Sequence, residues 1–187
     1  VLDGLKNLTT EVTESALHDP HPGVRRWAVR LAPTAKVPLS SLASMTTDTS
    51  AKVRLELACV AGQFGDAGDI PGELPPVARS VLRSGSKTVD AAEILAELLH
   101  SDTDPYLRAA VMSSLNSTNI NNTIDKFITV VQADASANEP SVSKTASFTA
   151  ADRDELTSIL FEQAASIASD DNLERILRLT VDDSHGG

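Results

Sequence analysis

Four histidines and one cysteine are the side chains in this sequence best suited to holding a metal ion or attacking a substrate. His18 and His21 stand on either side of Asp19, so these three residues could be ligands of one metal ion. Structural zinc sites usually take more cysteine and histidine ligands than this segment provides. The end of one helix and the start of the next explain the sequence His18-Asp19-Pro20-His21 better. No metal site is therefore predicted.

A calcium loop and a reactive thiol are the other chemistries to weigh. Asp102-Thr103-Asp104 resembles the start of a calcium-binding loop, but the glycine and glutamate that such a loop needs are missing at the expected spacing. We expect helix capping there instead. Cys59 stands between Ala58 and Val60 in the middle of a predicted helix, so the pattern favours a buried, unreactive thiol. Phosphate-binding, GxSxG and HExxH motifs do not occur. No catalytic residue, metal ligand or cofactor is predicted.

The overall charge narrows the choice of partners. Sixteen basic and 26 acidic side chains give a formal charge of −10. Binding to nucleic acids or to anionic membranes relies on lysine and arginine, so both are disfavoured, although a local basic patch could still exist. No apolar run approaches the roughly 18 residues of a membrane-spanning helix. The predicted partners are therefore proteins or neighbouring domains of the same chain.

Three segments of the sequence repeat one another. Each has an aspartate, an aliphatic residue five positions later and an arginine directly after that. The segments contain Asp19, Val24 and Arg25; Asp48, Val53 and Arg54; and Asp102, Leu107 and Arg108. The first two are 29 residues apart and the last two 54, close to twice that distance. Such spacing is typical of degenerate helical repeats.

Each part of the repeat has a physical reason. The aspartate suits the turn before a helix, where it can accept hydrogen bonds from free amides. The arginine can lay its stem along the adjoining helix and pair with an aspartate of a neighbouring turn. The aliphatic residues recur at helical spacing and should form one buried stripe on each helix. These stripes contain Val24, Ala28 and Leu31; Val53, Leu57 and Val60; and Leu107, Val111 and Ser114.

The remaining pattern predicts further helices and no strands. Helices are predicted over residues 9–17, 37–45, 73–83, 87–99, 120–131, 151–169 and 173–181, with Thr149 as an N-cap followed by acidic Asp152. Residues 133–150 are rich in Ser, Ala and Asn and should form a loop or linker. The fold is thus predicted to be all-α, a right-handed α–α superhelix of about four to five helix pairs. Residues 1–132 would form the repeats and residues 151–187 a terminal helical pair with a frayed tail from 182.

Trp27 is the aromatic side chain whose position matters most, because aromatic residues make up only 3% of the chain. We predict that it packs in the core between the first two helix pairs. The alternative is an exposed binding anchor, since tryptophan is enriched at the centres of protein interfaces.

The repeats DPHPGVRRWAVRLA, DTSAKVRLELACVAGQFGD and DTDPYLRAAVMSSL resemble the HEAT-repeat region of large planctomycete-type membrane-bound dehydrogenases and haem-binding multidomain proteins. The resemblance covers residues 9–131. It implies an exported protein in which a flanking β-propeller and a c-type cytochrome domain carry the redox chemistry. This sequence has no CxxCH motif to attach haem c. It also begins at Val1 without a methionine, so we expect a fragment of a longer protein.

The function predicted from these features is a non-catalytic scaffold that binds a protein or spaces domains. An enzyme of the HEAT-like lyase or glycosylase type is the alternative. The glycosylase form would need a basic groove, which the acidic composition disfavours, and the lyase form would need a polar, acid-bearing pocket. A third hypothesis, non-covalent haem binding through Met45 or Met112, has little support because histidine and methionine are scarce.

Overall fold

The structure is a computed structural model that describes residues 8–64, 89–101, 104–136 and 149–167. Every regular element within these ranges is helical, which confirms the predicted all-α class. The α-helices are α1 (Thr10–Leu17), α2 (Pro22–Leu31), α3 (Leu39–Leu42), α4 (Ala51–Ala61), α6 (Ala91–Ser101), α7 (Pro105–Ser114), α8 (Ile120–Ser136) and α9 (Ala150–Ile167), and a 3₁₀ helix, η1, spans Ala43–Thr47. None of the described helices is long and apolar enough to cross a lipid bilayer.

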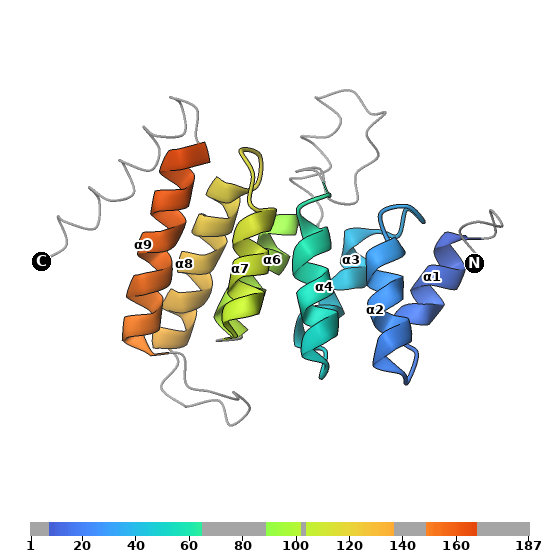
Figure 1. The fold of residues 1–187 in the computed structure, drawn as a ribbon. Coiled ribbons are helices and arrows are strands. Elements are labelled where there is room, and N and C mark those ends of the chain that lie inside the picture. Colours follow the sequence, from blue (N-terminus) through green and yellow to red (C-terminus); the bar gives the residue numbers. More distant parts are fainter. Residues whose placement is uncertain (1–7, 65–88, 102–103, 137–148, 168–187) are drawn as a thin grey trace, which may run out of the picture.

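The helices follow one another from end to end of an elongated molecule (Figure 1). Consecutive helices pack as pairs: α1 with α2, η1 with α4, α6 with α7, and α8 with α9. Between pairs, α2 packs on α4 and α4 on α7, which forms one layer. The other layer continues from η1 to α6 and from α6 to α8. Each pair therefore touches mainly the pair before it and the pair after it.

The three repeats begin their helices at the same position. The N-caps are His21, Ser50 and Asp104, each two residues after the aspartate of its repeat. Proline occupies the first position of α2 and of α7, where its missing N–H costs no hydrogen bond. The aspartate of the repeat also braces the turn: Asp48 accepts a 2.8 Å hydrogen bond from the amide of Ser50. The shared sequence pattern thus becomes a shared turn geometry.

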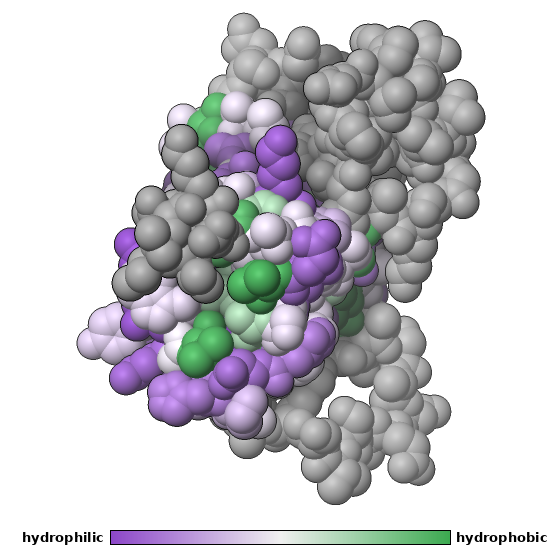
Figure 2. Space-filling view, turned by 90° about the vertical axis from the view of Figure 1, so that its right-hand side faces the viewer, coloured by the Kyte–Doolittle hydropathy of each residue, from purple (hydrophilic) through white to green (hydrophobic). Residues whose placement is uncertain are grey.

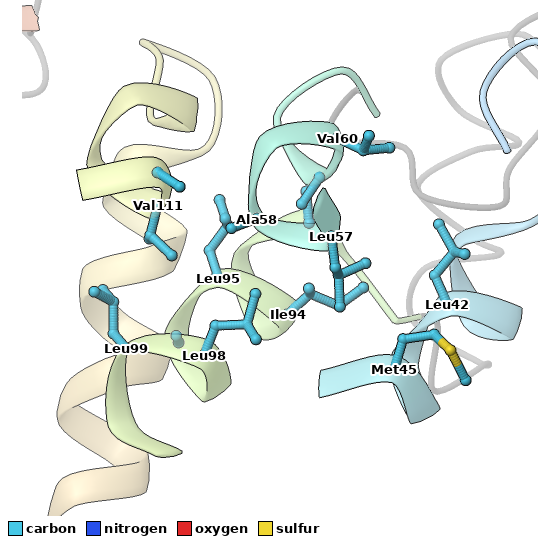
Figure 3. Packing of buried hydrophobic residues seen from close by; sticks show 14 of the residues in the cluster. Leu42, Met45, Leu57, Ala58, Val60, Ile94, Leu95, Leu98, Leu99 and Val111 are labelled. Carbon is cyan, nitrogen blue, oxygen red and sulfur yellow. The ribbon is translucent and has the colours of Figure 1, made fainter. Parts of the chain in front are cut away.

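Aliphatic side chains fill the space between the layers (Figure 3). Leu57 from α4, Leu95 and Leu98 from α6 and Val111 from α7 are completely buried. Burying a leucine or valine contributes about 2 kcal/mol. All three residues of the predicted stripe on α4 are buried. On α8 the buried hydrophobic residues are Ile120, Ile124, Phe127 and Val131.

The second and third repeats are direct neighbours, although 54 residues separate them in the sequence. Ser114 Oγ of α7 donates a 2.6 Å hydrogen bond to the Ala58 carbonyl of α4. Asn116 Nδ2 donates to the Gly62 carbonyl at 3.4 Å. Gly62 lies so close to the Ser114 carbonyl that a Cβ there would collide with it. The interpretation of this spacing as two repeat lengths is therefore wrong, because α4 packs on α7 with no further layer between them.

Several predicted boundaries shift. The segment predicted as one helix over 37–45 is divided into α3 and η1, and α8 continues to Ser136, four residues into the predicted loop. Thr149 caps α9 as predicted, and its hydroxyl accepts a hydrogen bond from the Asp152 amide at 3.2 Å. The Asp152 carboxylate in turn accepts from the Thr149 amide at 3.0 Å. The predicted helices over 73–83 and 173–181, the tail from 182, and Asp102 lie outside the described residues.

The N-terminal end of the molecule corrects the predicted stripe on α2. Val24 is 39% exposed, whereas its counterparts Val53 and Leu107 are buried. The buried residues of α2 are Ala28, as predicted, and Val29. In the layer that α2 shares with α4 and α7, α2 is the first described helix, so no earlier helix of that layer covers Val24. Figure 2 shows this end, on which hydrophobic residues are separate spots within a mainly hydrophilic face.

Candidate interaction surface

The arginine of the first repeat joins two consecutive helix pairs of the stack. Arg25 donates from Nε to Asp48 Oδ2 at 2.7 Å and from Nη2 to Asp48 Oδ1 at 2.9 Å. The two side chains are only 14% and 4% exposed. The hydrogen bond from Arg25 holds the pKa of Asp48 below its ordinary value, against the opposing effect of burial. A bidentate pair of this kind fixes both distance and orientation between α2 and the turn before α4.

The arginines of the first two repeats, Arg25 and Arg54, also donate hydrogen bonds to the turns that precede their own helices. Arg25 Nη1 donates to the carbonyl of Asp19 at 2.9 Å, and Arg54 Nη1 donates to the carbonyl of Asp48 at 2.5 Å. In the third repeat, Arg108 reaches Asp152 of α9 at 3.6 Å. The described arginines of the repeat therefore hold turns and neighbouring helices in place.

The histidines of the first turn serve as caps. Asp19 Oδ1 accepts a 2.7 Å hydrogen bond from the His21 amide, and His21 Nδ1 accepts one of 3.1 Å from the Gly23 amide. Asp104, the last residue of the calcium-like segment, caps α7 by accepting from the Tyr106 amide at 2.8 Å. Within the ranges that the structure describes, no three histidine, cysteine or acidic side chains are placed to hold a metal ion.

Trp27 lies on the surface, so the predicted core position is wrong. Its side chain is 58% exposed on the side of α2 opposite the buried Ala28 and Val29. The guanidinium of Arg30 lies 5.1 Å from the centre of the indole ring, a cation–π contact one helical turn away. Arg26 donates from Nε to Glu56 of α4 at 2.8 Å. The indole thus contacts the Arg30 guanidinium and still reaches solvent.

Cys59 also differs from its predicted position. It is exposed, because the core side of α4 is formed by Leu57, Ala58, Val60 and Ala61. Partial burial raises the pKa of the thiol, and the nearby Glu56 raises it further. A thiol with a raised pKa stays protonated at neutral pH and is a poor nucleophile. The predicted burial of Cys59 is therefore wrong, and its low reactivity stays a prediction.

Tyr106 is the exposed aromatic residue that the sequence reasoning missed. It is 77% exposed in the first turn of α7 and lines a groove of about 160 Å³ with Ala51, Lys52 and Leu55 of α4 and with Asp104 and Leu107. One signal could have found it, because Tyr106 occupies the repeat position of Gly23 and Lys52. A position that takes glycine or lysine in the other repeats is typical of the solvent side of a helix, and Lys52 is exposed.

We use the name outer face for the exposed side of α2, α4 and α7 on which these residues lie. It contains Arg26, Trp27, Arg30, Lys52, Leu55, Glu56, Cys59 and Tyr106. Tryptophan, tyrosine and arginine are the residues most enriched at the energetic centres of protein interfaces. The chain has one Trp and one Tyr, and this face exposes both.

A second hollow lies between α1 and α3. It has a volume of about 430 Å³ and is lined by Leu17 and by six polar residues, namely Glu14, His18 and four serines. Its one carboxylate, that of Glu14, accepts a hydrogen bond from Ser41 at 2.8 Å. This contact joins α1 to the second helix pair.

Comparison of the chain with protein families, with characterised proteins and with solved structures finds no match in any of the three.

Proposed function

We propose that the chain is a non-catalytic scaffold that binds a protein through the outer face. The observation that carries this proposal is the exposure of the single Trp, on α2, and the single Tyr, on α7, on the same side of the layer that α2, α4 and α7 form. An aromatic side chain can bury 150–250 Å², so an exposed one does not make its large hydrophobic contribution to the stability of the fold. An apolar partner surface over Trp27 and Tyr106 would recover that contribution.

The finer description of the fold belongs to the same proposal. We infer a HEAT-like solenoid, a right-handed superhelix in which α2, α4 and α7 form the binding side. Three observations support it: equal helix starts in the three repeats, packing of each pair mainly on its neighbours, and the Arg25–Asp48 contact between successive repeats. Solenoids present extended surfaces for partners, because each added pair lengthens the same face.

Spacing of flanking domains is the second part of the proposed role. It rests on the resemblance to the HEAT-repeat region of planctomycete-type dehydrogenase and haem-binding proteins, which would place the parent protein outside the cytoplasm. The sequence of the parent gene on both sides of this chain tests it. A β-propeller domain on one side and a CxxCH-containing domain on the other are expected, and unrelated flanks would remove the redox context.

Partner capture tests the outer face. A photoactivatable crosslinker attached to Cys59 would be applied to an extract of the source cells, with the wild-type chain, the double variant Trp27→Ala with Tyr106→Ala, and Ile159→Ala. Ile159 is a matched control, since it is 38% exposed but lies on α9. We expect a defined set of crosslinked proteins that the double variant loses and Ile159→Ala keeps. Equal crosslinking by all three chains would contradict the proposal.

A further inference from the structure

Charge is unevenly distributed over the helices. Helices α2 and α4 together carry five of the 16 basic side chains and only one of the 26 acidic ones. The chain as a whole has a formal charge of −10, so these two helices form a basic island on an acidic protein. The potential next to this island favours anionic groups of a partner, whereas the net charge of the chain as a whole disfavours them.

Two arginines bring that charge to the solvent. The side chains of Arg26 and Arg30 are 47% and 55% exposed, whereas Arg25 is largely covered by its pairing with Asp48. Glu56 contacts both exposed arginines, at 2.8 Å and 3.9 Å, and is itself only 13% exposed. One recessed carboxylate thus orients two guanidinium groups and leaves the pair with a net positive charge. Oriented guanidinium groups match the geometry of carboxylates.

Apolar contacts lie on both sides of the arginines. Trp27 is next to Arg26 and stacks with Arg30, and the groove of Leu55 and Tyr106 opens between α4 and α7. Packed helices lie about 9 Å apart, so α2 and α7 are separated by about 20 Å across α4. About six residues of extended chain cover that distance. One short segment can therefore touch both aromatic side chains and pass the arginines.

We propose that the outer face binds an extended acidic segment of a partner protein, with one apolar side chain on Trp27, a second in the Leu55–Tyr106 groove, and carboxylates at Arg26 and Arg30. This inference rests on the proposed scaffold function and specifies its partner. A protein segment fits better than a nucleic acid, because a long phosphate backbone would meet the acidic remainder of the molecule. A short protein segment with carboxylates between two apolar side chains would contact only the basic island.

Synthetic peptides of about twelve residues test this chemistry. The acidic probe has two leucines six positions apart with glutamates between and around them, and matched probes replace every glutamate by glutamine or by lysine. An oligothymidylate of similar length is the nucleic-acid probe. Binding would be measured by titration calorimetry at low and at physiological salt. We expect the acidic peptide to bind at least about tenfold more tightly than the glutamine peptide, with a weaker affinity at the higher salt.

Variants test how much the charges of Arg26 and Arg30 contribute to binding, apart from the apolar contacts of the outer face. The double variant Arg26→Gln with Arg30→Gln should weaken the acidic peptide about tenfold and leave the glutamine peptide unchanged. Arg153→Gln on α9 is the control, since Arg153 is a similarly exposed arginine away from the outer face. Circular dichroism would verify that each variant folds.

Each contrary result has its own meaning. Equal binding of the acidic and glutamine peptides, sensitive to Trp27→Ala, would overturn the acidic partner and keep the binding face. Tighter binding of the oligothymidylate than of any peptide would overturn the proposed acidic protein segment and indicate a nucleic acid as the partner. If none of the probes binds, the proposed acidic segment is also overturned. The Cys59 crosslinking experiment would still test the scaffold function separately.

Discussion

At the scale of single residues, the Arg25–Asp48 pair carries the largest electrostatic consequence. Both carboxylate oxygens of Asp48 are bonded to the guanidinium, and both side chains are mostly buried. Removing one member of such a pair leaves a charge without its partner, which costs more than the pair itself contributes. The replacement of Asp48 should therefore lower the stability of the fold more than the replacement of a carboxylate whose arginine partners are about half exposed.

Asp48→Asn is expected to lower the melting temperature by about 5–10 °C, because it keeps the shape of the side chain and removes its charge. Glu56→Gln is the control, since its partners Arg26 and Arg30 are about half exposed; it should lower the melting temperature by less than about 4 °C. Differential scanning calorimetry of both variants makes the comparison. Equal effects would show that the Arg25–Asp48 contact does not hold the first two helix pairs together.

The pH dependence of stability follows from the lowered pKa of Asp48, whose main cause is the hydrogen bond from Arg25. In the unfolded chain an aspartate titrates near its ordinary value of about 3.9. The stabilisation by the folded carboxylate is therefore present above about pH 4 and is lost as pH falls through the lower, folded pKa. Urea unfolding of wild type and Asp48→Asn should differ most above about pH 5 and converge toward about pH 2. A constant difference would contradict this assignment.

Residue positions were predictable where a helix is covered on both sides. Val53, Leu57 and Val60 of α4 are buried as their spacing predicts, because α4 has α2 on one side and α7 on the other. Val24 and Trp27 were misplaced, because the pattern of α2 resembles that of an interior helix. Periodicity indicates which residues share a face, but the neighbours of the helix decide whether that face is covered.

At the scale of elements, Gly62 controls how closely α4 and α7 approach. A Cβ at this position would collide with the backbone carbonyl of Ser114, which also lies beside the hydrogen bond from Ser114 to Ala58. Backbone cannot rotate away as a flexible side chain can. Gly62→Ala is expected to lower the free energy of unfolding by about 2 kcal/mol, measured by urea denaturation.

Gly23→Ala is the matched control for Gly62→Ala. A Cβ at Gly23 would meet only the His21 ring, at 2.9 Å, and that side chain can turn aside. Alanine also has a better helix propensity than glycine, so the net change should stay within about 1 kcal/mol. A loss as large as that of Gly62→Ala would mean that replacing a glycine disturbs the helix end itself, for example its capping, and that the α4–α7 contact is not the cause.

Helix starts were more predictable from the sequence than helix order. The repeat spacing and the leading prolines are local signals, and α2, α4 and α7 each begin three residues after the aspartate position of their repeat. The contact between α4 and α7 depends on residues more than 50 positions apart, such as Ala58 and Ser114, and no local pattern specifies it. The end of α8 at Ser136 was missed because a Ser- and Ala-rich segment is compatible with both helix and loop.

At the scale of the whole molecule, contacts between neighbouring pairs imply uneven stability along the stack. Helix α4 packs on α2, η1, α6 and α7, whereas α1 packs mainly on α2 and α9 mainly on α8. In a linear array, the end pairs can open without disrupting the middle. Hydrogen exchange followed by mass spectrometry should show the slowest amides in α4 and α6 and faster exchange in α1 and α9. Uniform protection would indicate a single cooperative unit instead.

The exposure of Trp27 has a practical consequence for spectroscopy. Fluorescence excited near the red edge of aromatic absorption comes from tryptophan, and this chain has only one, on the outer face and beside Arg30. Its emission should already resemble that of a solvated indole in the native state, so it will change little when the aliphatic core melts. The same emission should shift to the blue when a ligand covers the indole. The native protein can therefore report ligand binding at the outer face without an added label.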